Sequence, residues 1–154
     1  MPAASPIPDN YPRMTPFLAV NGAEAAIAFY TDIFGMRERS RMQLPDGRIG
    51  HAELEIGDSL LMLSDEFPEM GVRGPKSLGG SPTRMSIYVE DVDATWQRAI
   101  AAGAQEVRPL ETHFYGDRSG QIEDPWGQAW NLAMRVEDLT PEEIENRAKI
   151  MFPE

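Results

Sequence analysis

Three ionisable side chains alternate along one short segment, where Ala52 and Leu54 separate His51, Glu53 and Glu55. Alternation places the three on one face of an extended strand. An imidazole beside carboxylates can act in acid/base chemistry or hold a divalent cation, but solvated strand faces carry such residues as well. A solvated face is the plainer interpretation. If the chain has a catalytic pair, the candidates are His51 and Glu53, and a metal would add Glu55 as a third ligand.

The loop that follows predicts where this polar row lies. Gly57 and Asp58 come between two segments with apolar alternation, residues 51–56 and 59–64. A two-residue hairpin loop would pair Ile56 with Ser59 and set Glu53 opposite Met62. The polar row would then lie next to the middle of the following strand.

The elements around this hairpin are predicted to recur. The first half reads as a strand, a helix with its N-cap at Asn21, and three strands, over residues 14–20, 23–34, 37–44, 51–56 and 59–64. The second half starts again with a strand at residues 84–89 and a helix at residues 92–102. One offset of 69 residues aligns three pairs: Val20 with Val89, Gly47 with Gly116, and Leu63 with Leu132. A duplicated module explains this agreement.

The two ends of the chain lie outside the repeat. Residues 1–13 are interrupted by prolines and are predicted to form an extended arm. Thr140, Pro141 and Glu143 form a helix start, and the apolar stripe of that helix needs cover from the body or from another subunit. We therefore expect an α+β fold in three parts: an arm at 1–13, a domain at 14–139 with modules at about 14–64 and 83–139 and a linker at 65–82, and a C-terminal helix at 140–154.

Composition limits the possible partners. The chain has 154 residues, a formal net charge of -11 and no cysteine. Disulfides and thiolate ligands are excluded, and the acidic charge argues against nucleic acid, whose binders cluster Lys and Arg. No apolar run is long enough to span a membrane, and the first residues do not read as a secretory signal. We expect a cytoplasmic protein that binds neither nucleic acid nor membrane.

Short motifs in both halves point to a known family. The first half carries FLAV at residues 17–20, AAIAFY at 25–30, FGM at 34–36, HAEL at 51–54 and LMLSD at 61–65. The second half carries YGDRSG at residues 115–120, DPWG at 124–127 and WNLA at 130–133. Together, over about residues 7–139, these resemble the glyoxalase/bleomycin-resistance/extradiol dioxygenase (vicinal oxygen chelate) superfamily, in particular its bleomycin-resistance-like branch. The resemblance implies two βαβββ modules, with sheets curved around a central cavity, in a homodimer.

The resemblance also implies where a metal would bind. Metal-dependent members of the superfamily carry His or Glu near the start of each module's first strand and in the middle of its last strand. Those places fall on Thr15, Met62, Arg84 and Asn131. None of these side chains is a usual ligand for a divalent first-row metal. We therefore expect no metal cofactor at the inherited positions.

The same strand faces would line a pocket for a small molecule. The candidate ligand-binding residues are aromatic, apolar, cationic or amide side chains: Phe17, Met62, Arg84, Tyr88, Tyr115, Trp126 and Asn131. Phe17 and Met62 are equally compatible with ordinary core packing, and Arg84 with an ion pair to Glu53.

Three functions are compatible with this pattern. The first is a metal-free protein that binds and sequesters a drug-like or metabolite ligand. The second is a lyase or isomerase that acts on a small oxygenated substrate through an atypical metal or acid/base site. The third is a regulatory or scaffolding dimer without a relevant ligand.

Overall fold

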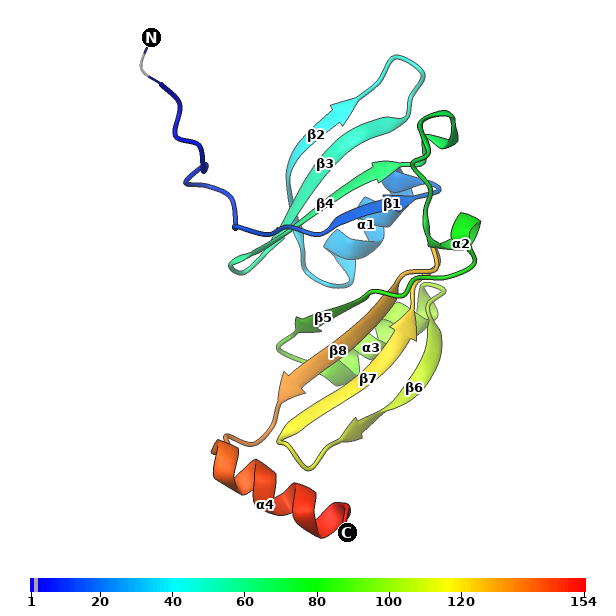
Figure 1. Ribbon diagram of the computed structural model, residues 1–154. Coiled ribbons are helices and arrows are strands. Elements are labelled where there is room, and N and C mark those ends of the chain that lie inside the picture. Colours follow the sequence, from blue (N-terminus) through cyan, green and yellow to red (C-terminus); the bar gives the residue numbers. More distant parts are fainter. Residues whose placement is uncertain (2) are drawn as a thin grey trace. The chain divides into compact units, whose positions relative to one another are not determined.

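The same order of elements, one strand, one helix and three strands, is built twice along the chain (Figure 1). The computed structural model describes Met1 and residues 3–154, and it divides into unit 1, Met1–Gly79, and unit 2, Gly80–Glu154. Helix α1 spans Ala23–Asp32 and helix α3 spans Val92–Ala101, so both ends of α3 lie 69 residues after those of α1. The predicted repeat and the α+β class are confirmed.

Unit 1 is a mixed sheet covered on one face by α1. Its further elements are β1 (Phe17–Val20), β2 (Arg37–Gln43), β3 (Ile49–Ile56), β4 (Ser59–Asp65), the 3-10 helix η1 (Pro68–Met70) and α2 (Pro75–Leu78). The strand order is β1-β4-β3-β2, with β1 parallel to β4 and the other pairs antiparallel. The segment at residues 65–82, predicted as a linker between the modules, contains two short helices.

Unit 2 repeats this sheet in the order β5-β8-β7-β6. As in unit 1, the first strand along the chain, β5, is parallel to the last, β8. Its elements are β5 (Arg84–Tyr88), α3 (Val92–Ala101), β6 (Gln105–Thr112), β7 (Asp117–Glu123), β8 (Ala129–Arg135) and α4 (Pro141–Met151). No helix in the described part of the chain is long and apolar enough to cross a membrane.

The core of unit 1 lies between the sheet and α1. Strand side chains alternate between the two faces, and the fully buried set includes Val20, Ala52, Leu54 and Leu63. They pack on the apolar face of α1, where Tyr30 is fully buried. The opposite face of the sheet, which carries His51, Glu53 and Glu55, is left for polar chemistry.

One carboxylate joins α1 to two strands of unit 1. The prediction of Asn21 as the N-cap of α1 is wrong, because Gly22 holds that position and no side chain caps it locally. Asp65, at the end of β4, instead accepts hydrogen bonds from the backbone N–H groups of Gly22 at 3.2 Å and Ala23 at 2.8 Å. Its other oxygen accepts from Ile49 N at 2.7 Å. The register between helix and sheet thus depends on Asp65.

Helix α4 begins as predicted, with a capping box between Thr140 and Glu143. Arg147 ties it to unit 2 by donating to Glu137 at 2.8 Å and to the carbonyl of Phe114 at 3.2 Å. No residue of the helix is buried. Its predicted apolar stripe is therefore only partly covered within the chain.

We predict that Asp65→Ala lowers the free energy of unfolding by about 3 kcal/mol, because three backbone N–H groups lose a charged acceptor. Urea unfolding followed by circular dichroism measures this. Asp58→Ala, in the exposed loop between β3 and β4, is the matched control and should change the free energy by less than about 0.5 kcal/mol. Equal effects of the two substitutions would contradict the capping role.

Candidate functional site

The polar row lies on the face of the unit 1 sheet that points away from α1. The predicted two-residue loop is present, since Ile56 pairs with Ser59 and Glu53 pairs with Met62. Phe17 of β1 pairs with Met62 in turn. Glu53, Met62 and Phe17 therefore occupy neighbouring positions on β3, β4 and β1.

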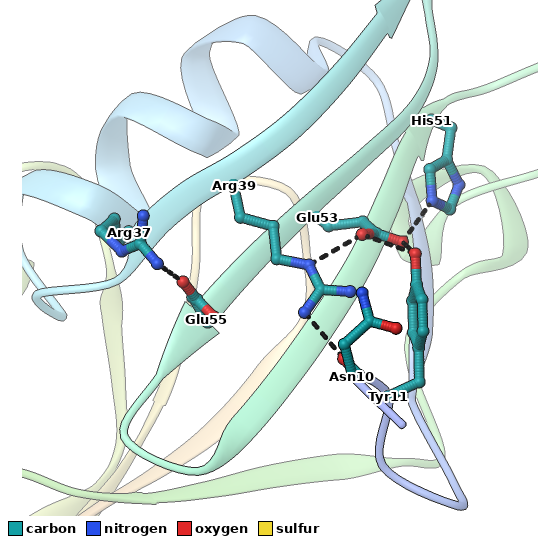
Figure 2. A network of polar contacts seen from close by, with 7 residues as sticks. All are labelled: Asn10, Tyr11, Arg37, Arg39, His51, Glu53 and Glu55. Atoms are coloured by element: carbon teal, nitrogen blue, oxygen red, sulfur yellow. Dashed lines mark hydrogen bonds and ion pairs between the residues drawn. The ribbon is translucent and has the colours of Figure 1, made fainter. Parts of the chain in front are cut away.

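Glu53 is the centre of a network of hydrogen bonds (Figure 2). Its side chain is buried, with 4% of the residue exposed. The carboxylate accepts from Arg39 Nε at 3.0 Å and from the Tyr11 hydroxyl at 3.0 and 3.1 Å, and it lies 3.0 Å from His51 Nε2. A buried carboxylate needs such partners, since an unpaired one would be strongly destabilising.

These partners keep Glu53 ionised. Burial is the largest single influence and raises the pKa of the carboxyl, but the hydrogen bonds from His51, Arg39 and Tyr11 together outweigh it and lower the pKa to about 2. At neutral pH the group is therefore an acceptor only. A base with so low a pKa takes up protons poorly, so Glu53 is suited to binding and orientation more than to proton transfer.

Strand β2 is bulged where Arg39 contacts Glu53. Glu38 pairs with Leu54 and Ser40 pairs with Glu53, so Arg39 is an extra residue between two successive pairs. Because Arg37 pairs with Glu55, a regular register would also set Arg39 opposite Glu53. The bulge instead changes the place of Arg41, which pairs with Ala52 and lies on the other face, where it forms ion pairs with Glu38 and with a side chain of α1.

Tyr11 comes from the N-terminal arm. The Arg39 guanidinium lies over its ring, 4.5 Å from the centroid, and Arg39 Nη1 donates to the carbonyl of Asn10 at 3.0 Å. Charge-assisted hydrogen bonds contribute about 1.5–3 kcal/mol each and the cation–π contact about 0.5–1 kcal/mol. Ordering each arm residue opposes this by about 1–2 kcal/mol. For Asn10 and Tyr11 together these contacts outweigh the cost of ordering, so the docked arm is favoured by about 1–3 kcal/mol.

A pocket of about 320 Å³ lies between the arm and the loop joining β3 to β4. Its lining consists of residues 9–12, Arg39, Glu55 and residues 57–60. Glu55 points away from the Glu53 network to an ion pair with Arg37 (Figure 2). The three residues of the predicted row therefore do not act together: His51 and Glu53 form one pair, and Glu55 belongs to another.

The apolar candidates in unit 1 flank this network. Phe17 is 53% exposed, and its ring contacts the His51 ring, with 5.8 Å between their centroids. Met62 is half-buried. Phe17 is thus not a core residue, and it adds an aromatic surface beside the polar network.

Unit 2 places its candidates at two ends of one sheet face. Tyr88, 61% exposed, donates to Asp117 at 2.6 Å, and this hydrogen bond together with partial burial raises the pKa of the phenol. Tyr115 is stacked on His113 near the same end, with the centroids 5.1 Å apart. Arg84 is exposed at the other end, where it pairs with Ala129.

The remaining two candidates of unit 2 have structural partners. Asn131 donates to the hydroxyl of Ser86 at 3.1 Å. Trp126 lies in the turn before β8, which the buried Asp124 holds by accepting from Trp126 N at 2.9 Å and from Trp130 Nε1 at 2.8 Å.

Within the polar row, Glu53 has no charged counterpart in unit 2. Asn131 pairs with Gln121 as Met62 pairs with Glu53, so Gln121 is the structural equivalent of Glu53. Gln121 follows Glu53 by 68 residues, whereas α3 follows α1 by 69. Strand β7 is therefore displaced by one residue from the position that the 69-residue repeat predicts. The ionised network is therefore a property of unit 1 alone.

The side chains at the inherited metal positions do not fit a metal. Thr15 and Met62 offer a hydroxyl and a thioether in unit 1, while Arg84 and Asn131 offer a cation and an amide in unit 2. Within the described residues, no group of three or more His, Asp or Glu side chains could hold a metal ion.

The sequence matches a known family. Residues 13–132 match the Glyoxalase/Bleomycin resistance protein/Dioxygenase superfamily. The chain belongs to this superfamily. The uncharacterized protein Rv0887c of Mycobacterium tuberculosis is 42% identical over 137 residues, covering 87% of this chain and 81% of that protein.

Solved structures show the same fold. Protein PA1353 from Pseudomonas aeruginosa superposes on this chain with a TM-score of 0.68 at 22% identity. The match covers 82% of this chain and 99% of PA1353. TioX from Micromonospora sp. ML1 gives a TM-score of 0.61 at 29% identity, covering 81% and 99% of the two chains.

Two residues of the network, Arg39 and Tyr11, are not among those predicted from sequence. A signal for Arg39 exists, because Arg37, Arg39 and Arg41 alternate on the segment that pairs with the polar row. Tyr11 has no periodic signal, since it lies between prolines in the arm. Its partner is 42 residues away in sequence.

We predict that Glu53 makes the free energy of unfolding depend on pH in the acidic range. Because its folded pKa, about 2, lies below the ordinary 4.5, its contribution is fully present above pH 4.5 and is lost as the pH falls toward 2. Between about pH 5 and pH 2, the wild type should lose about 1–2 kcal/mol more unfolding free energy than Glu53→Gln, with solvent screening taken into account. Urea unfolding across this range measures the difference, and parallel pH profiles would contradict it.

Proposed function

We propose that this chain is a metal-independent small-molecule-binding protein. The observation that carries the proposal is the ionised Glu53 carboxylate, held by Arg39 and His51 beside the exposed Phe17 ring. Preformed polar groups next to an aromatic surface are the usual composition of a ligand site. The carboxylate fixes the orientation of a donor group, and the ring contributes apolar contact.

Unit 2 supports the same function with different chemistry. Its open sheet face presents the exposed Tyr88 and Arg84, and Tyr115 is exposed in the turn before β7. Aromatic faces suit flat ligands, and an arginine suits an anionic group. The side chains at the inherited metal positions support binding without a metal.

One contact favours a second candidate, a lyase or isomerase acting on a small oxygenated substrate. His51 Nε2 lies 3.0 Å from Glu53, and the imidazole is about one-third exposed. An imidazole oriented by a carboxylate is the arrangement of many general bases. One structure of this fold is described as a glyoxalase-related enzyme from Fulvimarina pelagi, at 21% identity.

We predict that protein purified without added metal contains far less than one divalent metal ion per chain. Thr15, Met62, Arg84 and Asn131 provide no imidazole or carboxylate to hold one. Elemental analysis measures Ni, Zn, Fe and Mn together. About one ion of any of them per chain would overturn the metal-independent proposal.

A thermal-shift screen against aromatic and glycopeptide antibiotics should find ligands that raise the melting temperature, because a ligand that binds only the folded state stabilises it. Phe17→Ala should weaken the shift for ligands bound in unit 1, whereas Ile7→Ala, on the exposed arm, should not. His51→Gln separates the two candidate functions, since it would abolish general-base turnover but reduce binding only modestly. Absence of any stabilising compound would count against the binding function.

A further inference from the structure

The arm is an addition to a module that is also built without it. Unit 2 has the same order of strands and helix, and the position 69 residues after Tyr11 is Gly80. The family match begins at residue 13. Among the described residues before Met14, Tyr11 is the only one that is not exposed. Tyr11 is therefore bound to unit 1 through specific contacts and is not part of the repeated core.

Tyr11 contacts Glu53 and Arg39 in the way that a bound aromatic ligand would. Its hydroxyl lies 3.0 and 3.1 Å from the two carboxylate oxygens of Glu53. Its ring stacks under the Arg39 guanidinium at 4.5 Å. Glu53 and Arg39 together thus provide an ionised acceptor for a hydroxyl and a flat cation for an aromatic face.

We propose that the Arg39–Glu53–His51 site binds a hydroxylated aromatic ring, and that Tyr11 of the chain's own arm occupies this site in the structure. The inference rests on the proposed small-molecule-binding function and names the ligand class for unit 1. A phenol bound in place of Tyr11 donates its hydroxyl proton to a hydrogen bond with Glu53 and stacks on Arg39. His51 holds Oε2 of the carboxylate, while Arg39 holds Oε1.

The pocket between the arm and the β3–β4 loop further limits the class of ligand. Its lining contains the carboxylates of Asp9, Glu55 and Asp58 and one cation, Arg39, which is already paired with Glu53. Substituents of the ring that extend into this pocket are therefore neutral or cationic, because an anionic group would meet like charges. A ligand must also displace Tyr11, so the arm weakens the binding of simple phenols to the wild-type chain.

The test uses p-cresol, which is the tyrosine side chain ending in a methyl group, and the full-length Tyr11→Ala variant. Binding is followed by NMR of the two histidine rings, because His51 lies in unit 1 and His113 in unit 2. At about 10 mM, p-cresol should shift the His51 signals of Tyr11→Ala and leave those of His113 in place. Its affinity for Tyr11→Ala should be at least about tenfold higher than for the wild type.

Three controls make the outcome decisive. 4-Methylanisole has the same ring without a hydroxyl proton and should bind Tyr11→Ala about tenfold more weakly than p-cresol. Glu53→Gln in the Tyr11→Ala background should lower the affinity for p-cresol, because the acceptor is no longer charged. Ile7→Ala, elsewhere on the arm, should bind p-cresol like the wild type.

Equal binding of p-cresol and 4-methylanisole, or equal affinity of Tyr11→Ala and the wild type for p-cresol, would overturn the inference. So would shifts confined to His113. These results are independent of the antibiotic screen and of the metal analysis on the wild type, so the phenol site can fail while the small-molecule-binding function stands.

Discussion

A carboxylate removed from water must be surrounded by donors, and this requirement organises the open face of unit 1. Glu53 obtains its donors from three parts of the chain: Arg39 from β2, His51 from its own strand β3, and Tyr11 from the arm. Each donor is in turn held by another contact, Arg39 by the carbonyl of Asn10 and His51 by the ring of Phe17. The sheet face, the arm and the candidate site are therefore one cooperative structure.

The two units show how one module supports different chemistry. Both have the same strand order and a helix at the same place in the repeat. Where unit 1 has the buried, charged Glu53, unit 2 has Gln121 at the equivalent register position. The fold thus provides two open sheet faces, and the side chains on them determine which has a fixed charge. Family membership alone does not specify this, because function resides in sites carried by the fold.

Much of this structure could be predicted from sequence, and the exceptions have physical reasons. Alternation and the Gly57-Asp58 loop correctly predicted the pairing of Glu53 with Met62, because both signals are local. The bulge that turns Arg41 to the face of α1 depends on an irregular register between strands, which periodicity does not reveal. The cap of α1 by Asp65 and the docking of Tyr11 join residues more than 40 positions apart. Such contacts arise from the tertiary structure.

The most direct test is the ionisation of Glu53 itself. A ¹³C NMR titration of its side-chain carboxyl in the wild type should give a pKa of about 2, and the pKa should rise when Tyr11→Phe removes one donor. A pKa near the ordinary 4.5, unchanged in Tyr11→Phe, would mean that the donors do not hold the carboxylate in solution. The network would then not be the basis of the site.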